Sequence, residues 1–191
     1  MGPVLCYDYT MRLFIAIQLN DEMKDALARL QKQLQRQGVR GNFTRRENLH
    51  LTLAFIGEYP DPYDVKDVME TIDFEPFDIS LNGMGSFGSL WWMGLSGSGG
   101  SNTDSDELKT LARHLRRALA EASIPYDRKK FSPHITLVRK PSIRNGAEAG
   151  SGRAAIPAEV LADLPQASML VDHISLMRSE RGKHGMIYTE L

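Results

Sequence analysis

The chain has 191 residues, enough to bury one sizeable core, and its 42% hydrophobic and 25% charged residues are ordinary for a globular protein. A net charge of −1 argues against wholesale coating of nucleic acid, which needs many basic contacts, but is compatible with a local basic cleft. The single cysteine, Cys6, excludes an intramolecular disulfide and a cysteine-rich zinc site. Because no stretch is long and apolar enough to span a membrane and the first ten residues lack a signal-peptide pattern, we expect a cytoplasmic protein.

The first part of the chain predicts alternating strands and helices. Asn20 or Asp21 can cap the first helix, and Gly38 is placed to end it. The expected elements, in order, are a buried strand over 12–19, a helix over 21–37, a strand over 49–56, a helix over 63–72, and strands over 74–82 and 87–95 around a glycine-rich turn at Gly83 and Gly85.

The second part repeats this order coarsely. The expected elements are a polar loop over 96–106, a helix over 105–122, a strand over 131–138, a long loop within 141–166, and strands over 169–178 and 185–191. A helix followed by a strand and then by further strands occurs twice. We therefore expect an α+β fold with two pseudo-symmetric lobes, each an antiparallel sheet backed by helices, within one domain over 1–191.

A short phrase occurs twice, each time inside an expected strand: His-Leu-Thr-Leu at 50–53 and His-Ile-Thr-Leu at 134–137. Side chains alternate between the two faces of a strand, so His50 and Thr52 share one face, as do His134 and Thr136. The apolar residues between them anchor the opposite face. Two such strands facing each other would form a symmetrical acid–base site.

Histidine suits this chemistry because its unperturbed pKa is about 6.5. One imidazole can take a proton from water while the other gives a proton to a leaving oxygen, and the threonine hydroxyls can bind the oxygens of a phosphate. The carboxylates near either motif form no obvious cluster with the histidines, so the pattern requires neither a metal nor another cofactor.

Three further residues are candidates for substrate binding. Arg139 follows the second motif within a basic cluster, although strict alternation would point it away from His134 unless the strand twists or ends there. Phe14 and Phe43 are candidates to stack on a base, as aromatic residues do in the recognition of single-stranded RNA, although a core position also explains either one taken alone.

These motifs resemble the two-histidine (2H) phosphoesterase superfamily, and within it the RNA 2′,3′-cyclic phosphodiesterases, also called 2′-5′ RNA ligases. The resemblance covers 12–191. It is carried by RLFIAI at 12–17, NLHLTLAFIGE at 48–58, LWWMGL at 90–95, FSPHITLVRK at 131–140 and the closing ISLMRSERGKHGMIYTEL. The ending, with Ser179, Gly185 and Tyr188, favours the RNA phosphodiesterase branch.

The resemblance implies a bilobal fold with a pseudo-twofold axis and metal-independent hydrolysis of a terminal RNA 2′,3′-cyclic phosphate to a 2′-phosphate. His50 would give a proton to the departing 3′ oxygen, and His134 would take one from water. Thr52 and Thr136 would bind the phosphate, and Arg139 matches a family arginine. Microscopic reversibility would permit 2′-5′ ligation as a secondary reaction.

Two alternatives stay open at this point. One is a phosphodiesterase acting on 2′-5′ oligoadenylate or on a small cyclic nucleotide, and the other is a module that binds RNA ends without turnover. In each case we expect no membrane association and no obligate protein partner. A monomer is expected because the sequence contains no long coiled-coil pattern.

Overall fold

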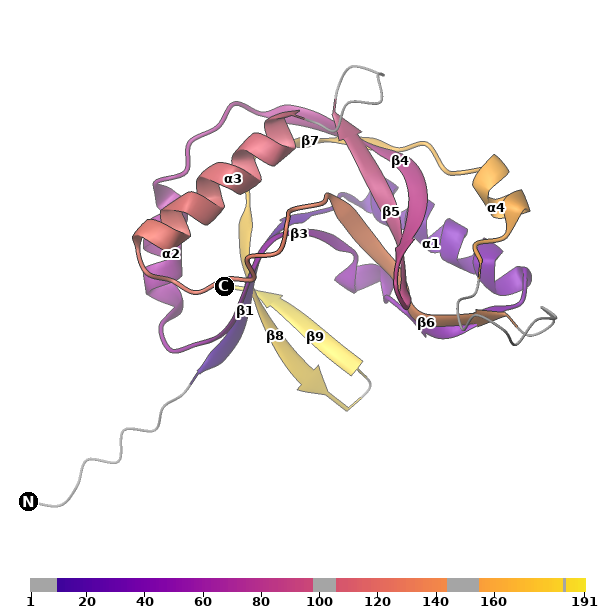
Figure 1. Ribbon diagram of the computed structural model, residues 1–191, viewed down its shortest axis with the longest axis horizontal. Helices are drawn as coiled ribbons and strands as arrows, with labels where there is room; N and C mark the ends of the chain where they lie inside the picture. Colours follow the sequence, from indigo (N-terminus) through magenta and orange to yellow (C-terminus); the bar gives the residue numbers. More distant parts are fainter. Residues whose placement is uncertain (1–9, 98–105, 144–154, 184) are drawn as a thin grey trace, which may run out of the picture.

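The computed structural model describes residues 10–97, 106–143, 155–183 and 185–191, and their strands form one nine-stranded sheet (Figure 1). The strands are β1 (Met11–Gln18), β2 (Val39–Phe43), β3 (His50–Tyr59), β4 (Phe77–Phe87), β5 (Leu90–Gly97), β6 (His134–Ile143), β7 (Ser168–Val171), β8 (Ser175–Gly182) and β9 (Gly185–Glu190). Their order is β7-β4-β5-β6-β3-β1-β8-β9, with β2 also paired to β6, and all of these pairings are antiparallel.

The two halves of the sheet meet where β3 and β6 lie side by side. Leu51 of β3 pairs with Ile135 of β6, and this is the register position that joins the strands. On one side of it lie β3, β1, β8 and β9, and on the other lie β6, β5, β4 and β7. The expected α+β architecture with two antiparallel halves is therefore confirmed, and the halves join through the two motif strands.

Within the described residues, four α-helices and one 3₁₀ turn accompany the sheet: α1 (Asp21–Arg36), η1 (Arg46–Asn48), α2 (Pro62–Glu70), α3 (Asp106–Glu121) and α4 (Ala158–Ala162). Asn20 caps α1 through its side-chain oxygen, which accepts a hydrogen bond of 2.9 Å from the main-chain N–H of Met23. Gly38 follows the helix with a φ of +83°, a conformation that glycine adopts readily. In Figure 1, α2 and α3 lie together at one end of the molecule and α1 and α4 at the other.

The core lies between the helices and one face of the sheet. Alternate residues of the strands and the apolar stripes of α1 and α3 supply it. Its fully buried side chains include Leu13, Ile15, Leu27, Leu34, Leu51, Leu53, Trp91, Leu108, Leu115, Ile135 and Leu137. Helix α1 packs on β2, β6 and β7, while α3 packs on β3 and β5. Each long helix thus precedes one motif strand in the sequence and covers the other in space.

Three expectations about strands were wrong. Strand β2 was not anticipated, because its five residues include Gly41 and only Val39 is fully buried. The turn expected at Gly83 and Gly85 is also absent, because strand β4 continues through both glycines. Gly83, with a φ of +71°, lies at an irregularity in the register instead, and the turn follows at Gly88.

The strand expected over 169–178 is two strands, because β7 pairs with β4 in one half whereas β8 pairs with β1 in the other. Most of the loop expected over 96–106, and much of that within 141–166, lies outside the described residues.

Candidate active site

The two motifs occupy adjacent, antiparallel strands and present their polar residues to the same cleft. The Leu51–Ile135 pair stands at the midpoint, with a histidine and a threonine on either side of it in each strand. All four polar side chains, those of His50, Thr52, His134 and Thr136, are half-buried and line the cleft. The sheet thereby brings together two segments that are 84 residues apart in the sequence.

Each motif strand has a β-bulge at the residue that follows the threonine. In β3, Thr52 and Ala54 pair with consecutive residues of β1, so Leu53 is the extra residue. In β6, Thr136 and Val138 pair with consecutive residues of β5, so Leu137 is the extra residue. A bulge of this kind leaves two consecutive side chains on one face and reverses the alternation beyond them.

This reversal places Arg139 in the cleft. Leu137 and Val138 are both buried in the core, so the next side chain emerges on the same side as Thr136. The strict alternation that would have turned Arg139 away is broken at the bulge. Phe55 holds the corresponding position after the first motif and also lines the cleft, with the guanidinium of Arg12 4.9 Å from the centre of its ring.

Polar side chains from the long helices bind the main chain at both bulges. The Gln31 Nε2 of α1 donates hydrogen bonds to the carbonyl oxygens of Leu137, at 2.9 Å, and Thr44, at 2.8 Å. The Arg116 Nε of α3 donates to the carbonyl oxygen of Leu53, also at 2.9 Å. Burial of Arg116 lowers the pKa of its guanidinium. Each motif is thus held by the helix that precedes the other motif.

Both histidines are oriented by the main chain in the same way. The Nδ1 atoms of His50 and His134 each lie 2.7 Å from a carbonyl oxygen two residues earlier, that of Asn48 and that of Ser132. A carbonyl only accepts hydrogen bonds, so Nδ1 carries the proton and Nε2 is the atom that can exchange one. The Nε2 of His50 lies 2.9 Å from the Thr52 hydroxyl. The arrangement therefore supplies one cleft with two imidazole Nε2 atoms that can exchange a proton.

The surroundings of the two rings are aromatic but different. The His50 ring packs against Phe14, with centroids 4.9 Å apart, and edge-on against Tyr188 at 5.2 Å. The His134 ring packs edge-on against Phe87 at 5.3 Å and lies 6.4 Å from Trp92. Tyr188 comes from the β8–β9 hairpin, whereas Phe87 comes from the end of β4.

Burial lowers the pKa of His50, and electrostatic interactions with Arg139, His134 and Lys24 lower it further. The hydrogen bond from Nδ1 to the Asn48 carbonyl acts in the opposite direction, because it favours the protonated ring. An anion bound beside Arg139 would offset the positive charges and raise the pKa of His50 again.

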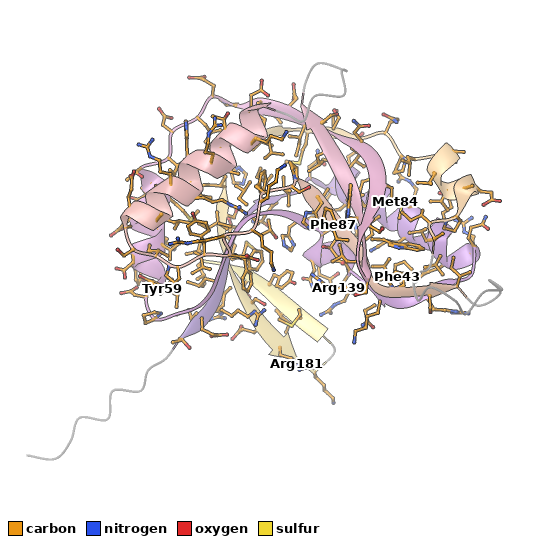
Figure 2. All side chains as sticks on the ribbon, viewed as in Figure 1. Phe43, Tyr59, Met84, Phe87, Arg139 and Arg181 are labelled. Atoms are coloured by element: carbon orange, nitrogen blue, oxygen red, sulfur yellow. The ribbon has the colours of Figure 1, made fainter. Side chains whose placement is uncertain are left out.

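The cleft has a volume of about 1470 Å³, and basic side chains predominate among its charged groups. The basic residues that line it are Arg12, Arg45, Lys129, Arg139, Arg178 and Arg181, and the acidic ones are Glu58, Asp127 and Glu180. Figure 2 labels Phe43, Phe87 and Arg139 toward the middle of the molecule and Arg181 on the β8–β9 hairpin. A net charge of −1 is compatible with a local basic cleft, and the structure contains one. Its charge suits an anionic ligand.

The cleft contains all seven residues singled out from the sequence, although not all are accessible in the same way. Phe14 is 3% exposed and packs on His50, so little of its ring is free to stack on a base. Phe43 is half-buried and pairs with Val138, the residue before Arg139.

Sequence reasoning did not single out several groups that shape the site. Asn48 and Phe55 line the cleft, Gln31 binds the Leu137 carbonyl and Phe87 contacts the His134 ring, and none of the four was a candidate. Phe55 and Arg139 hold equivalent positions three residues after the threonines, and this shared spacing is the signal that could have revealed the first of them. The other three depend on contacts between distant segments.

Among the described residues, no group of three or more His, Cys, Asp or Glu side chains is arranged to hold a metal ion. In the same part of the chain, no helix has the length and apolar character needed to cross a membrane.

Comparison with known proteins identifies the family of this chain. The model of the 2′-5′ RNA ligase superfamily matches residues 19–183. The RNA 2′,3′-cyclic phosphodiesterase of Aeropyrum pernix is 30% identical over 181 residues, which cover 88% of this chain and 94% of the relative. The protein of the same name from Methanothermobacter thermautotrophicus is 28% identical over 190 residues, covering 95% and 96%.

The fold agrees with that of a solved relative. The crystal structure of E. coli LigT complexed with 3′-AMP superimposes with a TM-score of 0.70 at 25% identity, covering 95% of each chain. The resemblance drawn from the paired motifs is therefore confirmed, and the chain belongs to the 2′-5′ RNA ligase superfamily.

Proposed function

We propose that this protein is an RNA 2′,3′-cyclic phosphodiesterase that converts a terminal cyclic phosphate to a 2′-phosphate by acid–base catalysis without a metal. One observation carries the proposal: two imidazoles from adjacent strands line one basic cleft, each with Nδ1 bound to a carbonyl and Nε2 available for proton transfer. The names of the relatives from A. pernix and M. thermautotrophicus support the same activity.

In the proposed reaction the Nε2 of His134 takes a proton from water as its oxygen attacks phosphorus. The P–O3′ bond breaks, and the Nε2 of His50 gives its proton to the departing oxygen. The acid therefore ends neutral and the base protonated, and exchange with solvent restores both. Burial makes His50 a stronger acid, and the negative charge of the bound phosphate favours its protonated form in the complex.

Three other side chains stabilise the charge that develops on the phosphate. The hydroxyls of Thr52 and Thr136 stand on either side of the central strand pair, where they can donate to the non-bridging oxygens. In the ligand-free protein the Thr52 hydroxyl donates to the neutral Nε2 of His50, so substrate would displace this bond. Arg139 supplies a fixed positive charge in the cleft.

Ligation to a 5′-hydroxyl RNA end is the same displacement of O3′ with an alcohol in place of water, and it is secondary in dilute aqueous solution, where water outcompetes the alcohol. Hydrolysis of 2′-5′ oligoadenylate or of a small cyclic nucleotide is not favoured by the names of the relatives. A cytoplasmic location and a monomeric state, expected from the sequence, stay predictions.

The test is hydrolysis of an RNA ending in a 2′,3′-cyclic phosphate, with EDTA present and the 2′- and 3′-phosphate products resolved. We expect EDTA-resistant turnover that yields the 2′-phosphate. A 3′-phosphate product, or turnover abolished by EDTA and restored by a metal, would contradict the mechanism. Parallel assays on 2′-5′ oligoadenylate and cyclic nucleotides test the alternative substrates, and binding without any turnover would indicate an RNA-end binding module.

A further inference from the structure

An exposed aromatic side chain stands next to the second motif. Phe87, at the end of β4, is 45% exposed, and its ring lies edge-on to His134 with centroids 5.3 Å apart. Among the described residues, the other large hydrophobic side chains that are exposed make no ring contact with a motif histidine. Singly exposed hydrophobic side chains are ordinary on protein surfaces, so the ring contact with His134 is the feature that distinguishes Phe87.

The ring of Phe87 packs on a second aromatic side chain. Its ring lies 4.9 Å from that of Trp92 at an interplanar angle of 32°, so one of its faces is covered and the remainder is open. The indole in turn lies close against glycines. A Cβ at Gly85 would overlap the Trp92 ring, and one at Gly94 would come within 3.2 Å of it. The two glycines therefore allow the indole to lie flat on the sheet as a backing layer.

The register places this aromatic pair on the side of His134. Leu90 of β5 pairs with both Phe87 and Arg139, so these two residues flank it in a single row across three strands. The ring contacts of His50 are with Phe14 and Tyr188 instead. The open aromatic surface thus adjoins the histidine that, in the proposed function, takes the proton from the attacking group.

We propose that Phe87, backed by Trp92, is a stacking platform for the 5′-terminal nucleoside of a second RNA, whose 5′-hydroxyl takes the place of water at His134. The inference rests on the proposed function and extends it to an acceptor strand. A water molecule needs no such platform, whereas a nucleobase gains affinity by stacking on an aromatic ring. Arg139, in the same row, supplies a positive charge for the phosphodiester backbone of the acceptor.

The chemical step uses no additional reactant. The bond from O5′ to phosphorus forms, and the bond from phosphorus to O3′ breaks. The proton of the 5′-hydroxyl passes to the Nε2 of His134, and His50 gives a proton to O3′. The product is a 2′-5′ phosphodiester with a free 3′-hydroxyl.

The experiment measures how one donor RNA partitions between water and an acceptor. A donor ending in a 2′,3′-cyclic phosphate is incubated with an excess of 5′-hydroxyl RNA, and the ratio of joined product to 2′-phosphate is determined. For F87A we expect this ratio to fall about tenfold, as loss of a base–aromatic stack predicts, whereas F87Y keeps it. The control is Y63A, which removes a 69% exposed aromatic side chain from α2, outside the cleft, and should leave the ratio unchanged.

The ratio separates an acceptor platform from a general effect on His134, because both reactions use the same base. If F87A slows both reactions equally, Phe87 serves only the histidine and the inference is wrong. It is also wrong if the parent hydrolyses the donor but never joins it to an acceptor. A parent that does not hydrolyse the donor overturns the proposed function itself.

The acceptor provides a second, independent measurement. In the parent, an acceptor with a 5′-terminal purine should join faster than one whose 5′-terminal nucleoside is abasic, because only the former can stack. F87A should reduce this preference to near unity. A preference that is the same in both proteins would overturn the platform even if F87A lowered ligation.

Discussion

The side-chain amide of Gln31 donates a hydrogen bond of 2.9 Å to the main-chain carbonyl oxygen of Leu137, the extra residue of the bulge in the second motif strand. Gln31 belongs to α1, the helix that precedes the first motif. Arg116 belongs to α3, the helix that precedes the second motif, and donates to the carbonyl of Leu53 in the first motif strand. The two halves therefore stabilise each other's motif, and the bulges that set the direction of the cleft side chains depend on both helices.

Replacement of Gln31 by leucine should weaken the second motif. Gln31 is 7% exposed, and its amide also binds the carbonyl of Thr44, so the variant leaves buried acceptors with fewer donors. We expect a loss of about 1–3 kcal/mol in the free energy of unfolding. The KM for the cyclic phosphate should rise as well, because the bulge directs Arg139 into the cleft. Denaturant unfolding and steady-state kinetics measure the two effects.

The matched control is Gln35→Leu, which makes the same substitution on the exposed side of the same helix. It should change neither stability nor KM appreciably. Equal stability of the two variants would show that the hydrogen bonds of Gln31 contribute nothing to the bulge.

The polar faces of the motif strands could be predicted because they depend only on alternation within a few residues. His50 with Thr52, and His134 with Thr136, share their faces as the spacing requires. The direction of Arg139 could not be predicted, since it depends on a bulge that forms against a neighbouring strand and under a helix side chain. The local sequence pattern carries no information about the neighbouring strand or about the helix side chain.

Elements that depend on contacts with distant segments could not be predicted correctly either. Strand β2 is short and mostly exposed, so its sequence has no period to detect. The sequence predicts a turn at Gly83 and Gly85, but in the structure Gly83 lies at a register irregularity and Gly85 packs against the Trp92 ring. Glycine marks an unusual backbone or a close approach, and the sequence alone does not distinguish the two.

The pKa of His50 should lie below the usual histidine value of about 6.5 in the free protein, because burial and nearby cations disfavour its charged form. An NMR titration of its ring protons measures this directly. Arg139→Gln removes a positive charge that lowers the pKa, so the His50 titration should move to higher pH. Binding of a nucleoside 2′-phosphate to the parent should move it in the same direction.

A control for these titrations is Arg36→Gln, since Arg36 at the end of α1 is exposed and is not among the charges that lower the pKa of His50. Its substitution should leave the titration unchanged. A His50 midpoint above 6.5 in the free protein would contradict the buried environment described for the ring.

Asn48→Ala should loosen the β8–β9 hairpin without removing the Nδ1 bond of His50. The Asn48 side chain donates to the carbonyl oxygen of Met186 at 2.8 Å, whereas His50 binds the Asn48 main chain. We expect a loss of about 1 kcal/mol in unfolding free energy and faster amide exchange in β9.

Arg45 donates to the same carbonyl of Met186, at 2.7 Å, so the two contacts are coupled. In a double-mutant cycle, Asn48→Ala and Arg45→Ala should be non-additive, because both side chains donate to one oxygen and only the double variant leaves it without either donor. Strict additivity of the two losses would mean that the side chains act on the hairpin independently.

The two motif histidines should be distinguished by the pH dependence that remains when one is removed. Each of His50→Ala and His134→Ala should lower kcat by about 10²-fold or more, and the double variant should be little worse than either, because the two groups act in one step. In His50→Ala only the base titrates, so the residual rate should rise with pH to a plateau. In His134→Ala only the acid titrates, so the residual rate should fall as the pH rises. The opposite pair of profiles would exchange the two roles, whereas parental rates in both variants would exclude acid–base catalysis by this pair.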